Sequence, residues 1–218
     1  MDRGLVSQQA APARGMDGLR EYRLVIYPDV AAYNKLMAEK QRFCRRFGVE
    51  PVMKSFPSIV VGCFYAREGM EETLIRWIQR ACSLCNSFFV TLNNYSGFPN
   101  HTIYLRITDA RPFRQLARQL KSIDDFVYSS CGRPARLVQH PYLALAEELP
   151  EQVYERAMSF YSSKILRASF PVNELVLLVR DHPFAVSKTV NVFRFAPGTE
   201  PVQADMARYI TSLQKEKT

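Results

Sequence analysis

The sequence predicts an α/β fold, or α+β in stricter naming, in which one domain contains two similar lobes. Short apolar runs rich in β-branched residues alternate with segments whose apolar residues recur at helical spacing. The second half of the chain repeats this rhythm, and no low-complexity linker separates the halves. With 218 residues, of which 47% are hydrophobic, the chain is long enough to bury a substantial core.

The first half contains four predicted strands and three predicted helices. A turn with Gly97 and Pro99 joins the third strand to the fourth, and Gly48 ends the first helix. The apolar stripe of the third helix includes Phe113 and Leu116. The strands are expected at 23–27, 57–65, 87–93 and 101–107, and the helices at 31–47, 71–85 and 110–121.

The second half begins with a predicted strand at 136–146, followed by a helix at 151–165 that Pro150 can open. Two further strands, 172–180 and 186–195, form a predicted hairpin. After Pro197 the chain is polar, with at most one short helix carrying Met206, Ile210 and Leu213. We therefore expect a flexible N-terminal tail at 1–20, one domain at 21–196 and a C-terminal tail at 197–218.

The compartment is predicted from the apolar stretches and the cysteines. The longest apolar stretch, 57–65, is too short to span a bilayer, and the N-terminal segment has no apolar run of signal-peptide length. Five cysteines are an odd number without regular spacing, so a disulfide framework is not expected. Cys82 and Cys85 form a CxxC pair on the apolar face of a predicted helix, which favours a core position over a zinc site. We predict a cytoplasmic protein without membrane partners, metal or cofactor.

The net charge of +8 is compatible with phosphate-rich partners, although many basic proteins bind no nucleic acid. Four basic residues of the predicted helix 110–121 are spaced i, i+3, i+7 and i+10, which places them on one stripe. Such a stripe is either a solvated face or, if it flanks a binding groove, a contact surface for RNA phosphates. These candidate phosphate-binding or RNA-binding residues are Arg111, Arg114, Arg118 and Lys121. A second basic cluster comprises Arg42, Arg45 and Arg46.

Two strands that precede a helix carry short motifs, PSIVV at 57–61 and HPYLA at 140–144, and the segment 97–99 leads into the strand 101–107. Together with the order of elements over 21–195, these segments resemble the two-histidine phosphoesterase superfamily. That superfamily includes the bacterial 2′-5′ RNA ligases and 2′,3′-cyclic phosphodiesterases. The resemblance implies two pseudo-symmetric lobes with antiparallel-rich sheets around a central groove, and helices outside.

In that superfamily each lobe contributes a strand bearing His-x-Thr or His-x-Ser. Residues i and i+2 of a strand share a face, so two such strands place two imidazoles and two hydroxyls around a phosphodiester. Here Ser58 and Val60 occupy the first histidine and threonine positions, whereas the second motif keeps His140 with Tyr142 in place of the hydroxyl residue. A serine without a partner is no general base near neutral pH.

The resemblance therefore implies a divergent member that binds a phosphate ester, an RNA end or a nucleotide, with weak or lost catalysis. Its candidate catalytic positions are Ser58, His140 and Tyr142, and Ser58 and His140 should lie across one groove. Two alternatives stay open. The protein could be an active phosphodiesterase or ligase that recruits His101 or another residue, or a structural protein whose groove is filled with side chains. The sequence leaves the oligomeric state undetermined.

Overall fold

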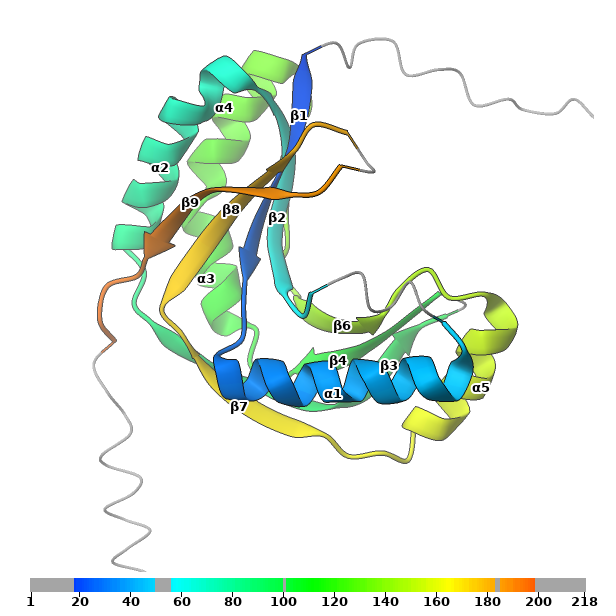
Figure 1. Ribbon diagram of the computed structural model, residues 1–218. Helices are drawn as coiled ribbons and strands as arrows, with labels where there is room; N and C mark the ends of the chain where they lie inside the picture. Colours follow the sequence, from blue (N-terminus) through cyan, green and yellow to red (C-terminus); the bar gives the residue numbers. More distant parts are fainter. Residues whose placement is uncertain (1–17, 50–55, 100, 183–184, 199–218) are drawn as a thin grey trace, which may run out of the picture.

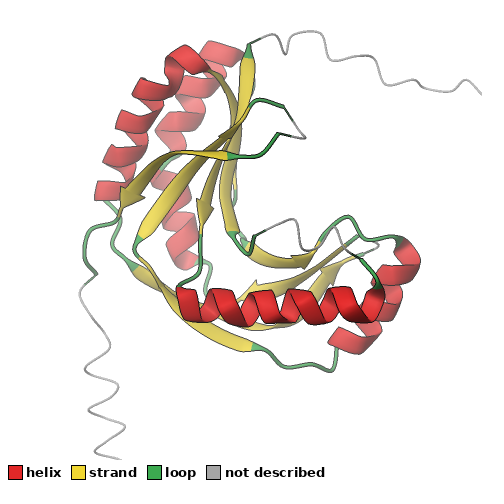
Figure 2. Cartoon of the chain, in the orientation of Figure 1, coloured by secondary structure: helices red, strands yellow, loops and turns green. Residues whose placement is uncertain are grey.

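A computed structural model describes residues 18–49, 56–99, 101–182 and 185–198. Within these residues the strands join in a single sheet, which curls into a C-shape with helices along it (Figures 1 and 2). The strands are β1 (Leu19–Ile26), β2 (Ile59–Arg67), β3 (Phe88–Phe98), β4 (Thr102–Ile107), β5 (Arg136–Leu137), β6 (Tyr142–Ala146), β7 (Arg167–Val172), β8 (Glu174–Arg180) and β9 (Lys188–Arg194).

The sheet has the order β7-β3-β4-β6-β2-β1-β8-β9, with β5 paired to β2, and all these pairs are antiparallel. It divides into two halves, β7-β3-β4-β6 and β2-β1-β8-β9, and the short β5 belongs to the second half. The two halves meet where Ile59 of β2 pairs with Leu143 of β6. The predicted α+β class with antiparallel strands is therefore confirmed, and the two expected sheets are joined into one.

Helix α1 (Val30–Phe47) begins and ends at residues with recognisable capping geometry. The Asp29 side chain accepts a hydrogen bond from the Ala32 N–H at the start of α1 (2.8 Å), and Gly48 ends that helix with a φ of 70°. None of the described helices is long and apolar enough to cross a membrane. The helices are α1 (Val30–Phe47), the 3₁₀ helix η2 (Glu68–Met70), α2 (Glu71–Ser83), α3 (Arg111–Gln119), α4 (Lys121–Cys131) and α5 (Glu151–Tyr161).

One face of the sheet forms the hydrophobic core. A row of directly paired, buried residues crosses five strands of this face: Tyr95, Leu105, Leu143, Ile59 and Ile26. Paired residues in a sheet point to the same side, so the core is continuous across both halves.

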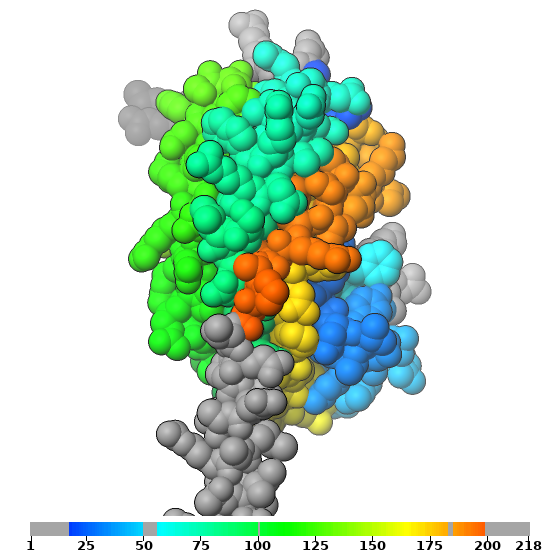
Figure 3. Space-filling view, turned by 90° about the vertical axis from the view of Figure 1, so that its left-hand side faces the viewer, coloured from blue at the N-terminus to red at the C-terminus, as the bar shows by residue number. Residues whose placement is uncertain are grey.

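The helices cover this core face. In the first half, the Tyr161 ring of α5 packs against Tyr95 of β3 (4.6 Å between centroids) and Phe43 of α1 (5.7 Å). In the second half, the Tyr22 hydroxyl of β1 donates to a Glu71 carboxylate oxygen of α2 (2.7 Å). Figure 3 shows part of the outer surface, where α2 lies beside α3 and α4 (green) and the end of β9 (orange). We call the opposite, helix-free side of the sheet the inner face.

Several predicted boundaries differ from the structure. The helix predicted at 110–121 is α3 and ends at Gln119, whereas α4 and β7 were not predicted. β1 begins at Leu19, two residues inside the expected N-terminal tail. Cys82 and Cys85 are buried, as predicted, and burial raises the pKa of the Cys82 thiol to about 12. The short helix expected around 206–213 lies outside the described residues.

Candidate functional site

The junction of the two halves brings together the strands that carry the two predicted motifs, and it places Ser58 and Tyr142 on the inner face. Ile59 and Leu143 pair and point into the core. Because successive strand residues point to opposite faces, the residues on either side of this pair point to the inner face. In antiparallel register, Ser58 lies toward Ala144 and Val60 toward Tyr142. On the inner face the junction thus presents the short side chains of Ser58 and Ala144, the Val60 side chain and the phenol of Tyr142.

His140 does not belong to this strand, which corrects the predicted continuous strand at 136–146. The N–H of Val138 donates to the Val61 carbonyl (2.8 Å), whereas Ile59 already pairs with Leu143. Residues 139–141 therefore form a bulge between β5 and β6, and the exposed His140 lies within it. The i, i+2 argument that placed His140 beside Tyr142 on one strand face does not apply across this bulge.

Aromatic rings surround Tyr142 on the inner face. Its ring centroid lies 5.0 Å from that of Tyr104 and 5.1 Å from that of Phe98, and burial raises the pKa of the Tyr142 phenol. The exposed His101 stands at the edge of this cluster, with its ring 6.2 Å from Phe98. Its Nδ1 is 2.6 Å from the Thr102 hydroxyl oxygen. Phe98 therefore lies against both His101 and Tyr142 and links the two side chains.

Arginines from three strands lie on the same face, and none of them was predicted as a site residue. Arg106 of β4 pairs with Tyr142. In the next row Arg136 of β5 pairs with Cys63, which in turn pairs with Arg23 of β1. The alternation of the strand 101–107 could have indicated Arg106, because it shares a strand face with Tyr104. Arg23 and Arg136 both lie beside Cys63 because of the strand order, and the alternation within one strand could not predict this.

A buried ion-pair network continues this face into β8. The Glu21 carboxylate is 7% exposed and accepts hydrogen bonds from Arg23 (2.6 Å) and Arg180 (2.5 Å). The Cys63 thiol also donates to it (3.4 Å). Burial by itself would raise the pKa of Glu21, but the two guanidinium groups outweigh that effect and lower it. Glu21 therefore stays ionised and fixes the position of Arg23.

The predicted basic stripe lies on α3 and the start of α4. Two of its members are held by local carboxylates: Arg111 by Asp109 (2.8 Å), and Lys121 by Asp124 (3.1 Å) and Asp125 (2.7 Å). Arg114, Arg118 and Lys121 line a hollow of about 350 Å³ that also includes Gln139, the residue before His140. The stripe thus adjoins the β5–β6 bulge, and its contact with phosphates stays a prediction.

Metal-ligating side chains do not gather in the part of the chain that the structure describes. No group of three or more His, Cys, Asp or Glu side chains there is placed to hold an ion.

Known structures share this arrangement of strands and helices. Escherichia coli LigT complexed with 3′-AMP matches with a TM-score of 0.57 at 14% identity, over 82% of this chain and 99% of that chain. A crystal structure titled phosphoesterase matches with a TM-score of 0.55 at 14% identity, over 81% and 99%. The protein TT0787 of Thermus thermophilus matches with a TM-score of 0.50 at 16% identity, over 82% and 98%. At these identities the likeness concerns the fold.

A comparison with curated protein sequences finds no match. The family model of the 2′-5′ RNA ligase superfamily matches residues 60–183, which is more than half of the chain. The matched segment includes β6 and most of β2, the two strands that meet at the junction. The chain belongs to the 2′-5′ RNA ligase superfamily.

Proposed function

We propose that the inner face at the β2–β6 junction binds a phosphate ester, either an RNA end or a nucleotide, with weak or lost catalysis. The observation that carries this proposal is the identity of the four residues around the Ile59–Leu143 pair, which include no imidazole. Transfer of a proton to or from the reacting group by one positioned side chain contributes about 10²–10⁴ in rate. Without both a positioned general acid and a positioned general base, turnover falls by several orders of magnitude.

The arginines and aromatic rings support the binding part of the proposal. Guanidinium groups bind phosphate oxygens with paired, charge-assisted hydrogen bonds, and Arg23, Arg106 and Arg136 share the inner face. The rings of Phe98 and Tyr104 offer a surface on which a nucleobase can stack. Structures of E. coli LigT hold 3′-AMP, phosphate, NADP⁺ and ATP, which supports a phosphate ester or nucleotide as the ligand class.

The candidate catalytic positions keep limited roles in this proposal. His140 is the imidazole next to β6, and from its bulge it can serve as one proton-transfer group. Tyr142 can donate a hydrogen bond to a phosphate oxygen, whereas Ser58 lacks a base to activate it. Val60 is 37% exposed, so the described side chains leave this part of the junction open, which favours a ligand site over a filled groove.

Isothermal titration with 3′-AMP tests the binding. Arg106→Gln should weaken the affinity about tenfold or more, because a hydrogen bond to a charged group contributes about 1.5–3 kcal/mol. The control is Arg76→Gln, which removes another exposed arginine on α2, a helix that covers the core face of the sheet. If the wild type does not bind 3′-AMP, or if Arg106→Gln binds it as the wild type does, the proposed site is wrong.

A further inference from the structure

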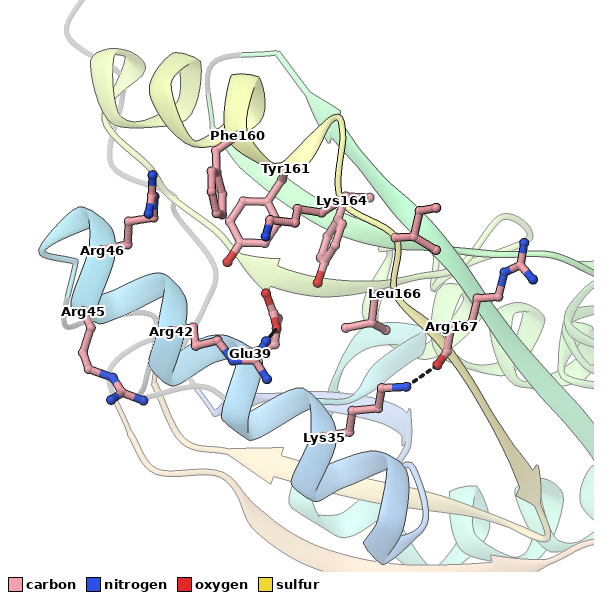
Figure 4. A pocket seen from close by; sticks show the side chains of 12 residues that line it. Lys35, Glu39, Arg42, Arg45, Arg46, Phe160, Tyr161, Lys164, Leu166 and Arg167 are labelled. Carbon is pink, nitrogen blue, oxygen red and sulfur yellow. Dashed lines mark hydrogen bonds and ion pairs between the residues drawn. The ribbon is translucent and has the colours of Figure 1, made fainter.

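Basic residues also line a second place, a cavity of about 630 Å³ between α1, α5 and the start of β7, and Figure 4 shows that the guanidinium groups of two of them, Arg45 and Arg167, are directed away from it. The cavity is separate from the inner face, because α1 and α5 pack on the core side of the sheet. Its volume lies within the range of about 300–1,000 Å³ that small-molecule sites occupy. The cations that line it are Lys35, Arg42, Arg45, Arg46, Lys164 and Arg167.

At the floor of the cavity lies Glu39, the one carboxylate among the described residues that line it. Glu39 is buried and forms an ion pair with Arg42 (2.8 Å). Burial and the Glu39 carboxylate raise the pKa of the Tyr95 and Tyr161 phenols, so both phenols stay protonated and can donate hydrogen bonds to it. Glu39 is therefore engaged by neighbours at the floor, and it offsets only one of the six cations.

The cations at the rim are held by groups other than carboxylates. The Arg46 guanidinium lies 3.9 Å from the Phe160 ring centroid, and the Lys164 ammonium lies 4.7 Å from the same ring. The Lys35 ammonium donates to the main-chain carbonyl of Arg167. Cation–π and carbonyl contacts orient these groups without neutralising them. The pocket therefore keeps a concentrated positive charge. Its cations repel one another, and a bound anion would relieve that repulsion.

The spacing of the cations indicates the size of that anion. Lys35 and Arg46 are eleven residues apart on α1, or about 16 Å at 1.5 Å per residue. A single phosphate group is small beside such a row, whereas several linked phosphate groups can contact more of its cations at once. We propose that this pocket binds a small ligand that carries several linked phosphate groups, with Arg46 and Lys164 as its contacts at the mouth. This site is independent of the one proposed on the inner face.

The proposal can be tested by titration calorimetry with inorganic tripolyphosphate, which has no base or sugar. The wild type should bind tripolyphosphate more tightly than orthophosphate, and rising salt should weaken the binding. The double variant Arg46→Gln/Lys164→Gln should lose at least tenfold in affinity. It leaves the Glu39–Arg42 pair intact, and a thermal melt verifies that it is folded. The matched control Arg76→Gln/Arg80→Gln removes two exposed charges on α2, away from the cavity, and should bind as the wild type does.

Two outcomes would overturn the proposal. One is the absence of tripolyphosphate binding to the wild type at low salt. The other is equal affinity in the wild type and the Arg46→Gln/Lys164→Gln variant, which would place the bound phosphates elsewhere. The variant Arg106→Gln separates this site from the inner face. It should leave tripolyphosphate binding to the pocket unchanged, even though it weakens 3′-AMP binding.

Discussion

The Glu21 network is expected to contribute measurably to the stability of the fold, and Glu21→Gln tests this. The substitution keeps the shape of the side chain and removes its charge, so Arg23 and Arg180 lose their buried counter-ion. Removing one partner of a fully buried pair costs about 3–5 kcal/mol, whereas exposed pairs contribute about 0–1 kcal/mol. The Arg23 and Arg180 side chains are 37% and 20% exposed, so solvent screens part of the interaction. We expect an intermediate loss of about 2 kcal/mol.

For a domain of this size, that loss lowers Tm by about 4–8 °C, which thermal unfolding followed by circular dichroism can measure. The matched control is Glu72→Gln, because Glu72 is 86% exposed and its oxygen lies 4.0 Å from Arg76. The control should melt at the wild-type temperature. If Glu21→Gln also melts at the wild-type temperature near pH 7, the argument that the two arginines hold a stabilising carboxylate is refuted.

The same variant predicts a pH dependence. The pKa of Glu21 is lower in the folded state than its ordinary value of 4.5, so the unfolded chain takes up the proton first as the pH falls. The stabilisation is therefore complete above about pH 4.5, and it disappears as the pH falls through the lower folded-state pKa. The difference in Tm between wild type and Glu21→Gln should narrow over that acidic range and stay constant between about pH 6 and 8.

Three further predictions concern the core, the basic stripe and the altered motifs. Phe43→Ala should lower the free energy of unfolding by about 3–5 kcal/mol in urea titrations, because the ring is fully buried against aromatic rings of α1 and α5; a loss below about 1 kcal/mol would contradict this packing. If Arg114 and Arg118 contact phosphates, Arg114→Ala/Arg118→Ala should reduce the salt slope of single-stranded RNA binding by about 1.4, and an unchanged slope would make the stripe a solvated face. Ser58→His/Val60→Thr should raise hydrolysis of 2′,3′-cyclic AMP if the junction retains the geometry of the family, and unchanged activity in a folded variant would contradict that geometry.

Much of the fold could be predicted from the sequence because the apolar periodicity is strong in most elements. β2, α1, α2, β4 and β8 all lie within or close to their predicted ranges. The missed β7 contains Pro171 and lies at the edge of the sheet, where a strand needs fewer of its own hydrogen bonds. The missed α4 carries only Ile123 and Val127 as buried residues, so its helical stripe is short.

The details of the candidate site were harder to predict because they depend on register and strand order. An alternating apolar pattern through 136–146 does not reveal that 139–141 form a bulge, and that bulge removes His140 from the strand. Likewise, Arg23, Arg106 and Arg136 share a face only because β4, β6, β5, β2 and β1 are neighbours in the sheet. The pocket between α1 and α5 combines residues that are far apart in the sequence, and only the packed helices bring them together.

The most direct test of the proposed function is the hydrolysis of 2′,3′-cyclic AMP by the purified wild-type protein, measured alongside its binding of 3′-AMP. The protein should bind 3′-AMP and show little or no turnover, because the four positions around the Ile59–Leu143 pair supply no imidazole. Robust turnover that disappears in His140→Ala or His101→Ala would contradict this account. It would show that a histidine outside the paired strands completes an active site.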